Sequence, residues 1–408
     1  MLRNLIQPWF WPVLFAWLSL FALGLIDNAR GPVFPDILRE FGLSDTAGSF
    51  FFLTASVASL VHNTLFFRFL SLTSPQRLVG IYTLIMGAGA ILISHATDYR
   101  WTLVACAVLG VGFGGLGVGQ NAAVQEAPPE HRQRAMGLLH TMYGISSFSA
   151  PLFVSYLAIH GWRFALVILS MPSMFVGLVV VFEGLRAAKM ERTASAKNRV
   201  RTHVVAKSGN LSSNAGFATV TMKRATWFAA SLVALLVVGE ISVSSRLALL
   251  ARREWGVGVE SAGTWVAAYF AAMTASRLFL GLFKFSFSAR ELLGFSILLG
   301  FPFLLLGFMP LGFSTGTRLV FLVGFGFPIA MGYPLAMTRL AEIFGDQKQK
   351  VTSLCLITQS GAAMFMHFTL GWGADTSGLL FVLGTVAITA LLGAFASFWF
   401  LERAVSKA

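Results

Sequence analysis

The chain has 408 residues, of which 56% are hydrophobic and 12% are charged. A soluble domain carries roughly 25% charged residues, so this composition excludes a soluble globular protein. The formal net charge of +13 is large enough for nucleic-acid binding. However, most Lys and Arg residues lie in a few loops, and this distribution excludes a nucleic-acid partner.

Strongly apolar segments recur along the whole chain. A helix that crosses the hydrocarbon core of a bilayer needs about 20 such residues, because there it must pair all of its own backbone N–H and C=O groups. The segments therefore predict twelve membrane-spanning helices. Their predicted ranges are 10–33, 47–67, 78–96, 101–126, 134–159, 163–184, 226–250, 262–284, 291–312, 318–344, 350–371 and 378–401.

Residues 186–224 separate the sixth and seventh predicted helices and contain the polar, basic stretch KMERTASAKNRVRTHVVAKSGNLSSNAG. They predict a cytoplasmic linker between an N-terminal six-helix half, 1–185, and a C-terminal six-helix half, 225–408. The concentration of Lys and Arg in this and other alternate loops places both termini in the cytoplasm by the positive-inside rule. We expect a monomer in a bacterial inner membrane, with the lipid bilayer as its partner.

Short matches at a shared spacing indicate that the two halves are repeats of one another. Residues 47–49 match residues 262–264, and residues 111–114 match residues 323–326, at offsets of 215 and 212 residues. At an offset of 213 residues, Asp27 falls beside Glu240. The first helix of each half is therefore predicted to carry an acid.

Parallel six-helix repeats joined by a linker are the plan of the major facilitator transporters. The stretches GLIDNARGPVFPDILREFGLSDTAG and GQNAAVQEAPPEHRQRAMGLLHTMYGISSFSAPL, together with Gly239-Glu240 and Ser276-Arg277, resemble the fucose permease branch of that superfamily. The resemblance covers nearly the whole chain. It implies an all-α major facilitator fold, a solute site between the halves, and symport of a sugar with a proton.

Charged residues inside the predicted spans are candidates for function, because an ionised side chain at the centre of a bilayer costs about 2.5–3.5 kcal/mol on insertion scales. Asp27 and Glu240 are the proton-coupling candidates, since a buried carboxyl can take up and release a proton. The alternatives are structural pairs: Asp27 with Arg30 at i+3, and Glu240 with Arg246 or Arg277.

Arg277 is a gating candidate that would pair with a carboxylate such as Glu342 or reach the cytoplasmic surface. A guanidinium is also suited to an anionic group of a substrate. Neutral amides suit a hydroxylated ligand, because both donate and accept hydrogen bonds, and aromatic rings suit the apolar face of a sugar. The substrate-binding candidates are Asn28, Gln120, Asn121, His140, Trp265, Tyr333 and Gln359. Each of them has helix packing as its alternative role.

The main functional hypothesis is a secondary transporter that works by alternating access on a small solute and protons. A proton-coupled exporter of drugs or other amphipathic compounds is the alternative, and the 39 phenylalanines keep it open. A transport-inactive sensor is a further alternative. A membrane-embedded enzyme would need clustered His, Asp or Cys residues, which the sequence lacks. We expect neither a cofactor nor a metal, because no His or Cys pair has metal-ligand spacing and residues 112–115 precede no phosphate-loop lysine.

Overall fold

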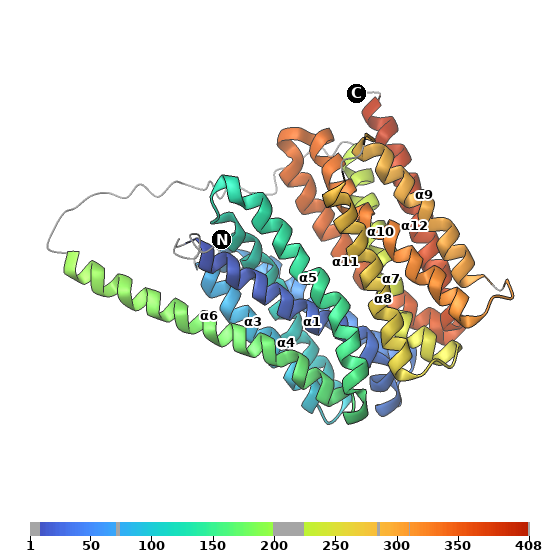
Figure 1. The fold of residues 1–408 in the computed structure, drawn as a ribbon, viewed down its shortest axis with the longest axis horizontal. Coiled ribbons are helices and arrows are strands. Elements are labelled where there is room, and N and C mark those ends of the chain that lie inside the picture. The colour runs from blue at the N-terminus through green and yellow to red at the C-terminus, as the bar shows by residue number, and fades with distance from the viewer. Residues whose placement is uncertain (1–8, 71–73, 199–223, 284–285, 310, 407–408) are drawn as a thin grey trace.

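The computed structural model describes residues 9–70, 74–198, 224–283, 286–309 and 311–406. In these ranges it contains twelve long α-helices and no β-strand. Figure 1 shows two helical bundles, the first blue to green and the second yellow to red. The all-α fold expected from the sequence is confirmed.

Within each bundle the helices follow one another with short connections. The first bundle contains α1 (Phe10–Glu40), α2 (Asp45–Leu70), α3 (Pro75–His95), α4 (Tyr99–Gln125), α5 (Pro129–Leu157) and α6 (Trp162–Asn198). The second contains α7 (Arg224–Glu254), α8 (Val259–Leu282), α9 (Ala289–Phe308), α10 (Thr315–Phe344), α11 (Lys348–Ser377) and α12 (Leu379–Ser406). Two short 3₁₀ helices, Ala158–His160 and Gly345–Gln347, follow α5 and precede α11.

Several helices extend beyond their predicted ranges, among them α1 and α6. α1 continues to Glu40 instead of ending at 33, although Pro32 and Pro35 each lack an N–H group. Both prolines are buried, so packing against neighbouring helices keeps α1 continuous through residues that weaken an isolated helix. α6 continues to Asn198 through a stretch rich in Ala, Lys, Glu and Arg, which favour helix. Residues 186–198 of the predicted linker are therefore helical, and 199–223 lie outside the described residues.

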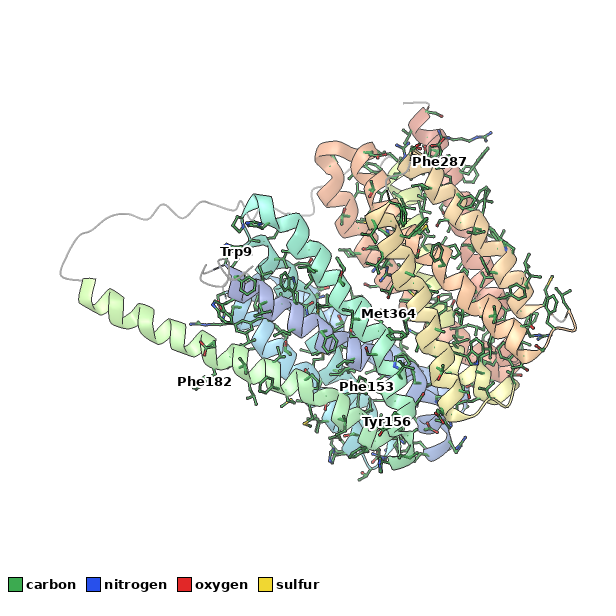
Figure 2. The ribbon with its side chains drawn as sticks, viewed as in Figure 1. Trp9, Phe153, Tyr156, Phe182, Phe287 and Met364 are labelled. Atoms are coloured by element: carbon green, nitrogen blue, oxygen red, sulfur yellow. The ribbon has the colours of Figure 1, made fainter. Side chains whose placement is uncertain are left out.

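The outer surface is apolar, as expected for a protein in lipid. Within the described ranges, ten helices are long and apolar enough to cross a membrane by length and composition, and α2 and α8 are not among them. Phe153, Tyr156 and Phe182 are 49%, 75% and 56% exposed, and Figure 2 shows Phe182 on the outer side of α6. Large exposed apolar side chains at this density are stable against lipid rather than water.

Glycines allow the helices of the first bundle to approach closely. A Cβ atom on Gly89 of α3 would lie 2.6 Å from the backbone nitrogen of Leu109 in α4. A Cβ atom on Gly110 of α4 would collide with the backbone carbonyl of Ala55 in α2. Between membrane helices such close packing replaces the hydrophobic effect as the main source of association. The glycines of α4 therefore fix how α2, α3 and α4 are rotated against each other.

The two bundles contact each other mainly through α5 with α8, α2 with α11, and α1 with α7. Gly263 and Gly371 lie at these contacts, because a Cβ atom on them would lie 2.8 Å from the Pro151 carbonyl oxygen and 2.6 Å from the Asp45 carbonyl oxygen. In Figure 1 the bundles converge where α1 ends and α8 begins, and diverge toward the end that carries both termini. We call these the closed end and the open end.

Replacing Gly110 with Ala should lower stability by about 1–3 kcal/mol, because the added methyl group meets backbone that cannot move aside. The midpoint of thermal unfolding of the purified protein measures this. Gly117→Ala on the same helix is the matched control, since a Cβ atom there has no neighbour within 4 Å. Equal melting temperatures for the two variants would contradict the packing argument.

Candidate functional site

A cavity of about 310 Å³ lies between the bundles. Helices α1, α2 and α5 line it from one bundle, and α7, α8, α10 and α11 line it from the other. Asp27 and Arg30 face it from the first bundle, and Glu240 and Arg277 face it from the second. The two acids that match in the sequence repeat are thus brought to one shared space.

Asp27 is held by one residue on its own helix and one on α5. Arg30, one turn further along α1, donates from Nη2 to Oδ1 of Asp27. The hydroxyl group of Tyr143 donates to Oδ2 of Asp27 at 3.0 Å. The neighbouring Asn28 donates from Nδ2 to the hydroxyl oxygen of Ser147 at 2.9 Å. The ion pair with Arg30 that the sequence offered as an alternative is therefore present, and Asn28 fastens α1 to α5.

Glu240 is held more loosely. Nη2 of Arg277 lies 3.5 Å from its Oε1 atom, at the long limit for a hydrogen bond. The hydroxyl group of Tyr269 donates to the backbone carbonyl of Glu240 at 3.3 Å. Arg277 therefore pairs with Glu240 and not with Glu342, which lies 3.0 Å from Arg339. This long ion pair joins α7 to α8 across the wall of the cavity.

Two predicted substrate-binding residues of α4 do not line the cavity. Gln120 is 2% exposed and donates from Nε2 to the hydroxyl oxygen of Ser19 at 3.0 Å, so it joins α4 to α1. Asn121 is exposed and donates to the carbonyl oxygen of Gly117 on its own helix at 2.8 Å. Adjacent positions on a helix point in different directions, and here neither direction leads to the cavity.

Two further predictions fall outside the cavity as well. His140 is exposed on α5, one turn before the lining residue Tyr143. Trp265 packs partly buried against the hydrophobic core in the first half of α8. The remaining two predictions, Tyr333 and Gln359, do line the cavity, together with Asn28.

The structure also brings residues to the cavity that the sequence did not assign to it. Phe52 and His367 line it from α2 and α11, and their rings stack with centroids 4.9 Å apart. Tyr143 binds Asp27 directly. Tyr143 lies one turn after the predicted residue His140, so the two are on neighbouring positions of one helix face. This spacing is the signal by which the sequence could have identified Tyr143. The stacking of Phe52 on His367 has no such signal, because α2 and α11 belong to different halves.

The closed end is held by ion pairs between the bundles. Arg252, near the end of α7, donates from Nη1 and Nη2 to the two carboxylate oxygens of Asp36 on α1, at 2.8 and 2.6 Å. The adjacent Arg253 pairs with Asp45 at the start of α2. The first pair is bidentate, and only 7% of the Arg252 side chain is exposed, so water competes with it weakly.

A carboxylate from the second bundle caps a helix of the first. Asp375 on α11 accepts hydrogen bonds from the backbone N–H groups of Asp45 and Thr46, both at 2.8 Å. The first N–H groups of a helix have no partner within the helix, and an acid there also meets the positive end of the helix dipole. This cap therefore joins α11 of the second bundle to α2 of the first at the closed end.

A polar cavity between two membrane-embedded bundles, closed at one end by ion pairs, defines an integral membrane transporter rather than an enzyme. The sequence matches the model of the Major Facilitator Superfamily over residues 16–251, and the chain belongs to this superfamily. No curated protein sequence matches it significantly.

Solved structures share the fold. A bacterial homologue of the human lysosomal transporter Spinster, inward-facing and unoccupied, is similar with a TM-score of 0.73 at 16% identity, and the match covers 98% of each chain. A D-xylose–proton symporter is similar with a TM-score of 0.66 at 13% identity, covering 94% of this chain and 96% of that one. Identities this low show a common fold and do not transfer a substrate.

Replacing Gly371 with Ala should hold the closed end apart, because the added Cβ atom would lie 2.6 Å from the carbonyl oxygen of Asp45. A cysteine in place of Ser56, which lines the cavity, reports the change, since Cys106 and Cys355 are both buried. A membrane-impermeant maleimide is supplied to intact cells and, separately, to inside-out vesicles. We expect labelling mainly from one side without the Gly371 substitution and from both sides with it.

Gly361→Ala on the same helix is the control, since a Cβ atom there has no neighbour within 4 Å. It should keep the one-sided labelling of the parent protein. One-sided labelling in the Gly371→Ala protein would show that this contact does not close the cavity.

Proposed function

We propose that this chain is a secondary active transporter that carries a small polar solute, a sugar or sugar-like metabolite, together with a proton. We also propose that it belongs with the fucose permease branch that its motifs resemble. One observation carries the proposal: Asp27 and Glu240, at matching places in the two halves, line one cavity, and each is paired with one arginine. The D-xylose–proton symporter with the same fold is consistent with it.

The ion pairs supply a way to couple the proton to the solute. Protonation of Asp27 removes the negative charge that holds Arg30, and protonation of Glu240 does the same for Arg277. The released guanidinium groups can then donate hydrogen bonds to the solute. By linkage, the bound solute favours the protonated carboxyl as strongly as the proton favours solute binding. Proton and solute therefore bind and leave together.

Alternating access follows from the arrangement of the bundles. In our proposal the halves are 1–185 and 225–408, and 186–224 is a cytoplasmic linker. With both termini in the cytoplasm of a bacterial inner membrane, the closed end faces outward and the cavity opens inward. To open the other side, the ion pairs of Arg252 and Arg253 and the cap from Asp375 must break. Their charges are then solvated by water. The transporter acts as a monomer, because the cavity is complete within one chain.

The lining of the cavity favours a polar solute over an amphipathic drug. Two carboxylates and two guanidiniums face the cavity, and the amides of Asn28 and Gln359 lie among them. An apolar ligand would have to displace water from these groups without replacing their hydrogen bonds, which weakens binding. A thermal-shift screen of the purified protein against sugars, organic acids and amphipathic drugs tests this point. A ligand that binds only the folded form raises the melting temperature.

Asp27→Asn should abolish uptake driven by a pH gradient while leaving solute exchange intact, because the amide cannot take up a proton but still fits the site. The measurement uses proteoliposomes and radiolabelled L-fucose, D-galactose and D-glucose, with and without an imposed gradient. Asp98→Asn is the control. Asp98 caps α4 outside the cavity through the backbone N–H groups of Arg100 and Trp101, and Asn is an equally good cap. Unchanged gradient-driven uptake in Asp27→Asn would remove Asp27 from the coupling mechanism.

A further inference from the structure

Two rings lie at the wall of the cavity that faces the closed end. The cavity is lined by Phe52 and Ser56 of α2 and, among the residues of α11, by His367. Both helices continue from there to the closed end, where Asp45 of α2 and Asp375 of α11 meet. Phe52 and His367 are therefore the lining residues of their helices nearest that end, and they are only 3% and 5% exposed.

The Phe52 ring lies across the boundary between the bundles. In the first bundle it packs edge-on against Phe34 of α1, with ring centroids 5.0 Å apart. From the second bundle, His367 stacks on it with centroids 4.9 Å apart and an angle of 13° between the rings. The Cζ atom of Arg246 on α7, also in the second bundle, lies 4.8 Å from its centroid. Four helices, α1, α2, α7 and α11, thus meet at one side chain.

The bundles also touch through their backbones, within about one helical turn of the residues that contact this ring. A Cβ atom on Gly31 of α1 would lie 3.3 Å from the carbonyl oxygen of Ser245 on α7. A Cβ atom on Gly371 of α11 would lie 2.6 Å from the carbonyl oxygen of Asp45 on α2. Side chains must fill the space between these two helix pairs, and the Phe52 ring contacts residues of three of the four helices from the fourth.

The layer between the ring and the closed end is buried, but its charges are not fully paired. Arg246 lies six residues from Glu240 in the cavity and six from Arg252 at the closed end, so it is about 9 Å along α7 from each. It is 2% exposed, and Nη1 and Nη2 have no hydrogen-bond partner among the described residues. Oδ1 of Asp45 is likewise buried without a partner there, although Oδ2 pairs with Arg253.

This incomplete pairing distinguishes the layer from permanent core packing. The cation–π contacts of Arg246 with Phe34 and Phe52 offset only part of the hydration that a buried guanidinium loses. Water that enters when the bundles separate would hydrate both Arg246 and the Oδ1 atom of Asp45. Hydration can therefore replace contacts of this layer when the closed end opens, as a gate requires.

We propose that Phe52 is an inner gate of the cavity. Its ring closes the space between the cavity and the closed end, and it leaves His367 and Arg246 when that end opens. This closure is separate from the ion pairs of Arg252 and Arg253 at the end of α7. The inference goes beyond the proposed function, because it concerns access to the cavity and is independent of the solute.

The test measures access to the cavity from each side. The reporter is a cysteine in place of Ser56, which lines the cavity one turn from Phe52. A membrane-impermeant maleimide is supplied to intact cells and, separately, to inside-out vesicles, without solute. Labelling of the parent protein should come mainly from one side, and labelling of Phe52→Ala from both, because truncation opens a path beside His367. Phe52→Leu keeps most of the apolar bulk, so its labelling from the second side should be slower than that of Phe52→Ala.

Two further variants test whether the effect is specific to Phe52. Phe51→Ala is the matched truncation: Phe51 is also buried, and its ring packs against Phe34 and Phe52 within the first bundle. Arg252→Gln removes the bidentate pair with Asp36. Both variants should keep one-sided labelling, because the Phe52 ring stays in place. Two-sided labelling in either of them would show that any loosening of this region opens the cavity, and would overturn the assignment to Phe52.

A distance across the closed end separates a gate from a contact that only holds the bundles together. Spin labels at Ile159 and Glu260, which are exposed positions, report this distance by pulsed electron paramagnetic resonance. It should be the same in Phe52→Ala as in the parent protein, because the ion pairs and the glycine contacts remain. A longer distance in Phe52→Ala, or one-sided labelling of that variant, overturns the inference.

The labelling experiment needs neither a solute nor a pH gradient, so it separates the gate from the proposed function. If Phe52→Ala opens the cavity to both sides while no solute is taken up with protons by the parent protein, the gate stands and proton symport fails. If uptake by the parent is driven by protons while Phe52→Ala is labelled from one side only, symport stands and the gate fails.

Discussion

The structure depends on one constraint: a charge inside the membrane must be neutralised by a partner, and two of the three main pairs here join different helices. The desolvation cost of a buried ion is several kcal/mol after relaxation, and only a close counter-ion or water offsets it. Asp27 pairs within α1, Glu240 pairs across α7 and α8, and Arg252 pairs across the two bundles. The pairs of Glu240 and Arg252 therefore stabilise a particular arrangement of helices.

The pairs at the closed end differ in kind from those in the cavity. The pair of Arg252 with Asp36 is short and bidentate, so it stabilises the closed end. The pair of Arg277 with Glu240 is long and exchanges more easily for a solute or a proton. In the proposed mechanism, opening of the closed end would bring these charges into water, where hydration would offset part of the lost pairing. When two conformations have similar free energies, a ligand that binds one of them only slightly more tightly can shift the protein from one to the other.

The helices could be predicted from the sequence because the features that indicate them, apolar length and intramembrane charge, are local. Apolar length predicted all of the long helices, and the intramembrane charges pointed to Asp27 and Glu240, which both reach the cavity. The rotation of each helix about its own axis could not be predicted from these local signals. Gln120 and Asn121 are neighbours in the sequence, but close packing of the α4 glycines turns one against α1 and leaves the other exposed.

Long-range geometry accounts for what the sequence did not predict. Arg246 was considered only as a partner for Glu240, whereas its position is determined by Phe34 and Phe52 on α1 and α2. The predicted linker, 186–224, begins within a helix, because the local helix propensity of that polar stretch extends α6 to Asn198. Polarity showed that the stretch does not span a membrane, but it did not determine its secondary structure.

The central claim is that the closed and open ends exchange roles around a fixed cavity. Pulsed electron paramagnetic resonance tests it with two pairs of spin labels, one across the closed end at Ile159 and Glu260 and one across the open end at Gly137 and Thr338, all exposed positions. When the pH is lowered and a solute that binds the protein is added, the label distance across one end should lengthen as the distance across the other end shortens. Distances that change in the same direction, or do not change at all, would contradict alternating access in this protein.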